Sequence, residues 1–151
     1  MSLADSDPER AVAILDEGLA LGRRPAHPYS SSTYLYAAVA HPDPREGLRR
    51  IRESLDDSRA NGTRQWIRRS LRECMSSLGA VDRHEAVAII DGASSPFTSR
   101  PRSAQFALDN ARAHLGDQVY EDRKVEGARL TDSELADALR RAIDLTLGDS
   151  S

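Results

Sequence analysis

The run Ala86-Val87-Ala88-Ile89-Ile90-Asp91 repeats, with one conservative change, the run Ala11-Val12-Ala13-Ile14-Leu15-Asp16, which lies 75 positions earlier. Each run follows an aspartate, Asp82 or Asp7, that can accept hydrogen bonds from the free amides at the start of a helix. Between the two runs, Asp43 precedes a third helical segment, 36 positions after the first aspartate and 39 before the last. These spacings indicate a repeat of about two helices per unit.

The three repeated segments share a pattern of side-chain size. Small residues occupy two positions seven apart, and a large aliphatic residue stands near the middle. The sets are Ala11, Leu15 and Gly18; Gly47, Ile51 and Ser54; and Ala86, Ile90 and Ala93. Small residues let one helix lie close against its neighbours, and the aliphatic residue fills the groove. The pattern predicts an all-α fold, in which antiparallel helical pairs stack as an α-solenoid of about seven to eight helices.

Helix-starting and helix-ending residues divide the rest of the chain. Aspartate followed by proline favours the first turn of a helix, and glycine favours its end. The expected helices cover residues 7–22, 31–40, 43–61, 63–78, 82–92, 103–115, 117–127 and 131–147. The last of these opens with a capping box, formed by Thr131 and Glu134.

The first expected helix is apolar on two faces. Val12, Leu15 and Leu19 share one face, whereas Ile14 and Leu21 lie on the opposite one. A helix of this kind is normally covered on both sides. We therefore expect the chain to be a piece of a longer array, and self-association through this end is plausible.

Composition excludes several classes of protein. The 151 residues suit one domain, and the 30% of charged residues nearly cancel to a net charge of −3. This balance excludes a polybasic protein and a disordered acidic tail. No apolar run reaches the length of about 20 residues that spans a membrane, so no membrane partner is expected. The single cysteine, Cys74, cannot form an intramolecular disulfide, which favours a cytoplasmic protein.

The C-terminal third carries a more specific signal. The segment from Ala111 to Leu135 reads ARAHLGDQVYEDRKVEGARLTDSEL. It resembles the segment that closes the tetratricopeptide-like helical-repeat region of large bacterial regulators, in which a signal-transduction ATPase is joined to a helix-turn-helix or cyclase domain. The residues that match are Leu115, Gly116, Asp117, Tyr120, Gly127, Leu130, Thr131 and Glu134. Lys124 stands where that family usually has an aromatic residue, and Leu135 where alanine is common.

The resemblance implies a domain organisation and a role. Residues 1–95 would form tetratricopeptide-like repeats, 96–102 a loop, 103–147 the closing helices of the same domain, and 148–151 a disordered tail. The role would be that of a non-catalytic scaffold in a transcriptional or signalling regulator, in contact with a protein partner or with neighbouring domains. The family's phosphate-binding loop, G-x-x-x-x-G-K-(S/T), does not occur in the chain. No cofactor is implied.

No pattern of chemistry-bearing residues predicts a catalytic or metal site. The four histidines, His27, His41, His84 and His114, lie far apart in the sequence, without the spacing of four that brings two ligands together on a helix. Cys74 lies on an apolar stripe with Leu71 and Leu78, where a buried thiol packs as a small apolar group. No serine has the flanking glycines of a nucleophile elbow. An enzyme with an unrecognised site is the weakest hypothesis.

Arginine is concentrated in one stretch. The segment from Arg45 to Arg72 contains nine arginines and only four acidic residues. Arg64, Arg68 and Arg72 follow one helix edge at a spacing of four. Arg45, Arg49 and Arg52 lie along the edge of the preceding expected helix. The candidate interaction surface comprises Arg45, Arg49, Arg52, Arg64, Trp66, Arg68 and Arg72.

This surface supports an alternative function, a nucleic-acid-binding module, because clustered arginines bind phosphate. Two features count against it. Trp66 is the one aromatic residue in the stretch that could stack on a base, and acidic residues (Glu53, Asp56 and Asp57) interrupt the face. A solvated helix face and a packing role for Trp66 are the simpler interpretations, so nucleic acid is not the expected partner.

Overall fold

The computed structural model describes residues 41–61, 67–94 and 102–148, together with Asp7, Glu9, Arg10, Ala13, Ile14 and Glu17. The continuous ranges contain the helices α4 (Pro44–Asn61), α5 (Ile67–Ala80), α6 (His84–Ala93), α7 (Arg102–Leu115), α8 (Asp117–Arg129) and α9 (Asp132–Gly148). None of the described residues forms a strand. The all-α prediction is confirmed for this part of the chain.

Three of the predicted helix starts have the expected capping contacts. The Asp43 carboxylate accepts a hydrogen bond from the amide of Arg45 at 2.9 Å, and Asp7 accepts one from the amide of Arg10 at 3.0 Å. The capping box is complete: the Thr131 hydroxyl accepts from the amide of Glu134 at 3.3 Å, and Oε2 of Glu134 accepts from the amide of Thr131 at 2.7 Å. These side chains satisfy amides that a helix start leaves free.

The predicted cap at Asp82 is wrong. Asp82 lies in the turn between α5 and α6 with a φ of 60°, a left-handed conformation that aspartate tolerates better than most residues. The turn is closed by the amide of Arg83, which donates to the carbonyl of Leu78 at 2.9 Å. Helix α6 therefore begins at His84, with Arg83 in the capping position.

Gly79 does not end α5, which continues to Ala80. A Cβ on Gly79 would approach the Cβ of Ala107 in α7 to 2.9 Å, so the missing side chain serves close packing between the two helices. Of the predicted loop 96–102, only the last residue is described, and it belongs to a helix. Ser94 already has an extended backbone, Arg102 opens α7, and the residues between them lie outside the described part.

The chain's two ends fall mostly outside the description. The expected helix 31–40 and most of 7–22 are not among the described residues. Ile14, which is described, is 51% exposed. Gly148 belongs to α9 rather than to the predicted tail, of which residues 149–151 are not described. No described helix combines the length and the apolar character needed to cross a bilayer.

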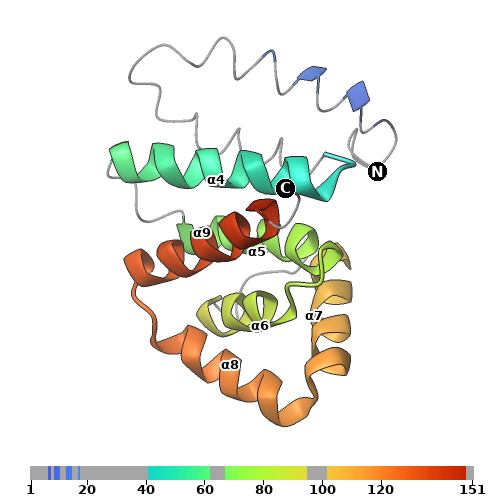
Figure 1. Cartoon of the computed structure of the whole chain (residues 1–151), viewed down its shortest axis with the longest axis vertical. Coiled ribbons are helices and arrows are strands. Elements are labelled where there is room, and N and C mark those ends of the chain that lie inside the picture. Colours follow the sequence, from blue (N-terminus) through green and yellow to red (C-terminus); the bar gives the residue numbers. More distant parts are fainter. Residues whose placement is uncertain are drawn as a thin grey trace.

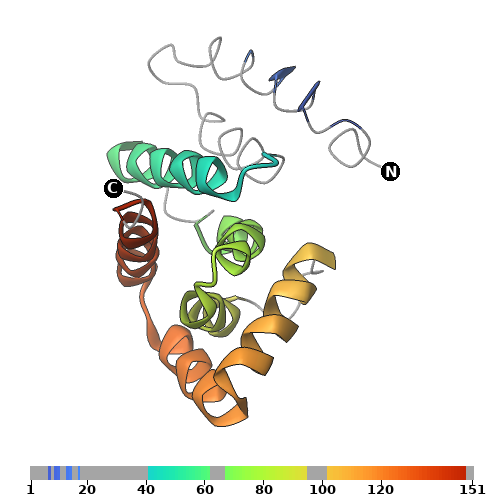
Figure 2. The ribbon, with the colours of Figure 1, turned by 45° about the vertical axis from the view of Figure 1, so that its right-hand side comes forward.

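Helices α5 and α6 lie in the centre of the described part, with α4, α7, α8 and α9 around them (Figures 1 and 2). Successive helices from α4 to α8 pack against each other, and the alternate pairs α5–α7 and α6–α8 also pack closely. Helix α9 departs from this order, because it turns back and packs on α4, α6 and α5 (Figure 2). The first and last of the described helices therefore lie side by side.

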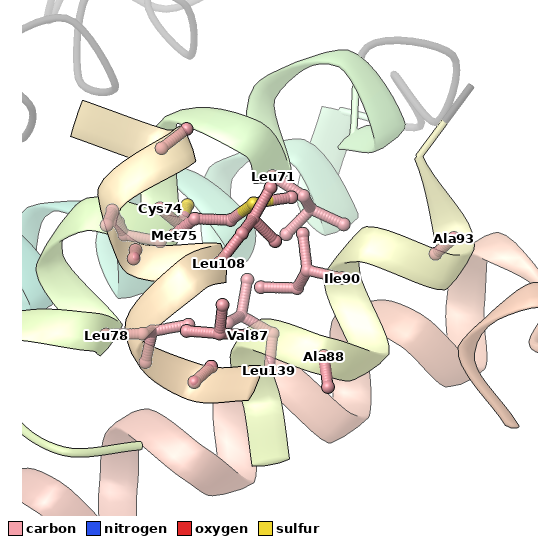
Figure 3. Close-up of a cluster of buried hydrophobic side chains, with 14 of the residues drawn as sticks. Leu71, Cys74, Met75, Leu78, Val87, Ala88, Ile90, Ala93, Leu108 and Leu139 are labelled. Carbon is pink, nitrogen blue, oxygen red and sulfur yellow. The ribbon is translucent and has the colours of Figure 1, made fainter. Parts of the chain in front are cut away.

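The core fills the space between these helices. Figure 3 shows Leu71, Met75 and Leu78 of α5 packed against apolar residues of neighbouring helices. Cys74 is fully buried, as its place on the apolar stripe predicts. The small-large-small pattern also lies largely inside: Gly47, Ile51, Ser54, Ile90 and Ala93 are buried, whereas Ala86 is half-buried.

Helices α6 and α8 approach each other very closely. A Cβ on Gly92 would overlap the backbone oxygen of Lys124, and a Cβ on Gly127 would overlap the backbone oxygen of Ile89. Each helix thus presents a glycine to the other's backbone. The same two helices share a hydrogen bond, in which the Tyr120 hydroxyl donates to the buried carboxylate of Asp91 at 2.9 Å.

Candidate functional site

The predicted basic surface is partly used inside the fold. Arg45 donates from Nη1 to the backbone oxygen of Thr146 in α9 at 2.9 Å. Nε of Arg52 lies 2.8 Å from Oδ1 of Asp144, also in α9. Arg140 of α9 in turn pairs with Asp56 of α4 at 2.8 Å. This edge of α4 is therefore a polar seam that holds α9, with one arginine of each helix, Arg52 and Arg140, paired with a carboxylate of the other helix.

Of the other predicted residues, only Arg49 has a described side chain. Arg49 is exposed and pairs with Glu46 on its own helix at 2.9 Å. Arg64 and Trp66 lie outside the described residues, and of Arg68 and Arg72 only the helical backbone in α5 is described. The surface consequently stays a prediction for these four residues.

We expect weak and sequence-independent DNA binding that disappears near physiological ionic strength, because the seam pairs Arg52 and carboxylates interrupt the α4 face. A labelled duplex and a labelled single strand titrated at several salt concentrations measure this, with the double variant Arg64→Glu/Arg68→Glu for comparison. Each phosphate contact of a true binding surface would lower log affinity by about 0.9 per tenfold salt. Tight binding at physiological salt that the double variant abolishes would establish the nucleic-acid alternative.

A different feature, a cavity of about 530 Å³, lies where α6, α8, α9 and the end of α7 meet. Its apolar walls come mainly from α6 and α9. Its polar residues come from the turn before α6, from the ends of α6, α7 and α8, and from Arg141 in the middle of α9. The lining residues are Asp82, Arg83, His84, Glu85, Ala86, Ile89, Ile90, His114, Leu115, Glu126, Leu135, Ala138, Leu139, Arg141, Ala142 and Leu145.

His84 is the most unusual of these residues. Its side chain is 5% exposed, and no donor or acceptor among the described residues forms a hydrogen bond with Nδ1. Nε2 lies 3.6 Å from the Asp82 carboxylate, and the ring centroid lies 4.3 Å from that of His114. Burial lowers the pKa of His84, and the neighbouring His114 lowers it further against the opposing effect of Asp82. The neutral form of the imidazole is therefore favoured at pH 7.

The charged residues beside the cavity largely neutralise one another. Arg123 of α8 bridges two of the lining carboxylates, Glu85 at 3.2 Å and Glu126 at 2.7 Å. Arg83 donates from Nε to the Thr146 hydroxyl of α9 at 2.7 Å. The remaining charged residues of the lining are Asp82, Arg83 and Arg141, one acidic and two basic.

The lowered pKa of His84 makes stability depend on pH. The unfolded chain takes up a proton near the ordinary pKa of about 6.5, whereas the folded chain does so at lower pH. Between these values the unfolded state binds more protons, so the free energy of unfolding falls as the pH drops below about 6.5, by at most about 1.4 kcal/mol per pH unit. Urea unfolding at pH 7.5 and 5.5 measures the difference. His84→Gln should reduce it, and an unchanged difference would contradict the buried neutral imidazole.

The sequence did not predict the histidine pair. His84 opens α6 and His114 lies in the last turn of α7, and only the packing of these helices brings the rings together. The spacing of histidines along a single helix does not report a contact between two helices. No cluster of three or more His, Cys, Asp or Glu residues suited to a metal ion occurs within the described ranges.

The residues of the C-terminal motif have structural roles. Tyr120 and Gly127 contact α6, and Thr131 and Glu134 cap α9. Arg112 lies over the Tyr120 ring at 4.3 Å and pairs with Asp117 at 3.0 Å, which fastens the start of α8 to α7. Comparisons of the chain with protein-family models, with curated proteins and with solved structures found no match. The case for a function therefore depends on the contacts of the chain itself.

Proposed function

We propose that this chain is a non-catalytic helical-repeat scaffold within a multidomain bacterial transcriptional or signalling regulator. Its helices would form tetratricopeptide-like pairs of an α-solenoid, and its partner would be another protein or a neighbouring domain of the regulator. The observation that carries the proposal is the packing of alternate helices, α5 on α7 and α6 on α8, in addition to successive ones. In a stack of helical pairs each helix contacts the equivalent helix of the next unit.

The roles of the motif residues support the same proposal. The family pattern places an aromatic residue and a glycine in the penultimate helix, and here Tyr120 and Gly127 make the close contact between α8 and α6. An interaction domain requires residues that hold its helices together, and these two residues do so.

The position of α9 suggests how such a stack would end. By turning back onto α4 and α6, it covers apolar surface that a further repeat would otherwise cover. The polar seam of Arg45, Arg52 and Asp144 fixes this arrangement. Under the proposal α9 is a closing helix, and signals would pass between the scaffold and its neighbours through the stacked pairs.

Two observations test the proposal: the segments encoded in the same reading frame as the chain, and the regulated output of the full-length product. A phosphate loop, G-x-x-x-x-G-K-(S/T), with a helix-turn-helix or cyclase segment in the same reading frame would support the proposal. In that full-length product, weakening the scaffold with Gly127→Ala should alter the regulated output while the isolated ATPase segment still binds nucleotide. A reading frame without these segments, or an output indifferent to a scaffold shown to be destabilised, would overturn the proposal.

A further inference from the structure

Helix α8 is attached to the other described helices mainly through α6 (Figures 1 and 2). Two ion pairs cross this contact. Arg123 pairs with Glu85 at 3.2 Å, and both of these side chains are exposed. Nζ of Lys124 lies 3.4 Å from Oδ2 of Asp91, and here the lysine side chain is 39% exposed whereas the aspartate is only 3% exposed. The second pair therefore joins a side chain that solvent reaches to a carboxylate that solvent does not reach.

The two pairs differ in what they contribute to the contact. An exposed ion pair adds little stability, because water screens its charges. A buried carboxylate that loses a positively charged partner destabilises the folded state far more. Oδ2 of Asp91 accepts the Tyr120 hydroxyl as well, so α8 supplies both a hydrogen bond and a positive charge to the same oxygen. The charge of Lys124 is therefore part of what holds α8 on α6.

Lys124 is also chemically unlike the other basic residues. It is the only lysine in the chain, and all the remaining positively charged side chains are arginines. A guanidinium stays protonated and does not act as a nucleophile near neutral pH, whereas a lysine amine does. An acyl group on Nζ removes the positive charge. Acylation of basic side chains thus has a single target in this chain, and that target lies beside a buried carboxylate.

We propose that Lys124 is an acylation site, at which transfer of an acyl group from a thioester weakens the attachment of α8 to α6. The ammonium first gives a proton to water. Nζ then attacks the carbonyl carbon of the thioester, a nitrogen–carbon bond forms while the carbon–sulfur bond breaks, and the second proton leaves with the thiol. The product is a neutral amide 3–4 bonds longer than the contact with Asp91 accommodates as an ion pair. The inference does not depend on the proposed scaffold role.

Two reagents that modify the same amine separate charge from size. N-hydroxysuccinimidyl acetate acetylates Lys124 and the terminal amine, and hydroxylamine afterwards removes acetyl groups from hydroxyls. This treatment should lower the melting temperature by about 3 °C or more. Amide hydrogen exchange in α8 should become about fivefold faster, with α4 little changed. Reductive methylation modifies the same amines but keeps their charge, so the methylated chain should behave like the untreated one.

A thioester tests the proposed donor directly. Incubation of the chain with acetyl-coenzyme A at pH 8 should place an acetyl group on Lys124, located by peptide mapping, and the acetylated fraction should show the same loss of stability. The variant Lys124→Arg keeps the positive charge and removes the acceptor amine. It should be about as stable as the original chain, and neither acetylating reagent should lower its melting temperature.

Further variants locate the effect at the buried carboxylate. Lys124→Gln lacks the charge and should reproduce the loss of stability without any reagent. The matched control is Arg123→Gln at the adjacent position, which removes a charge from the exposed pair with Glu85 and should cost much less. In an Asp91→Asn background no buried charge needs a partner, so acetylation of Lys124 should no longer lower the melting temperature.

Three results would overturn the inference. One is a chain acetylated at Lys124 that is as stable as the methylated chain, because the charge would then not hold α8. A second is the absence of acetylation of Lys124 by acetyl-coenzyme A. A third is an equal loss of stability on acetylation in the Asp91→Asn background, which would mean that the acyl group acts elsewhere than on the buried carboxylate.

Discussion

Gly127→Ala should lower the free energy of unfolding by about 3 kcal/mol or more, enough to unfold a marginally stable domain. The added methyl group would overlap the backbone oxygen of Ile89 in α6. A neighbouring side chain can rotate away from an inserted methyl, but a backbone carbonyl within a helix cannot. The two helices must therefore separate, which loosens the apolar contacts on either side of the glycine.

Gly92→Ala should have a similar effect, because its Cβ would meet the backbone of Lys124 in α8. The matched control is Gly148→Ala at the end of α9, where a Cβ would meet nothing within 4 Å. Urea unfolding followed by circular dichroism compares the three variants. A stability close to that of the original chain for both Gly92→Ala and Gly127→Ala would show that α6 and α8 do not approach so closely.

The sequence predicted the buried large residues of α4 and α6 correctly. Ile51 and Ile90, the large residues of the repeat pattern, are both buried, because their spacing from small neighbours reflects a helix face that packs. The caps at Asp43 and Thr131 also follow from local chemistry. The predicted cap at Asp82 is wrong, because the tight turn after α5 places this residue in a left-handed conformation before the helix begins.

The features that depend on contacts between distant segments were not predictable. Arg52 has Asp56 one turn away on α4, yet it pairs with Asp144 of α9, and Asp56 pairs with Arg140. These partners follow from the return of α9 to α4, which no periodicity in the sequence records. The cavity and the contact between His84 and His114 have the same origin, since they arise where the ends of several helices meet.

Replacement of Tyr120 is the second change with a large expected effect. The side chain is 2% exposed, and Tyr120→Ala should cost about 3–5 kcal/mol through the lost apolar contacts and the space left between α8 and α6. Tyr120→Phe keeps the ring and removes only the hydroxyl that donates to Asp91 at 2.9 Å. Hydrogen bonds to a charged group contribute about 1.5–3 kcal/mol, so this variant should lose an amount in that range.

A double-mutant cycle separates the hydrogen bond from the packing. The Asp91 side chain is 3% exposed, and Nζ of Lys124 lies 3.4 Å from the same Oδ2 that accepts the Tyr120 hydroxyl. If the hydroxyl stabilises this buried carboxylate, Tyr120→Phe should cost much less in an Asp91→Ala background than in the original chain. Asp109→Ala, which removes an exposed carboxylate on α7, is the control and should change stability by less than about 0.5 kcal/mol. Equal costs of Tyr120→Phe in both backgrounds would mean that the hydroxyl and the carboxylate are not coupled, and that the ring of Tyr120 alone holds α8 against α6.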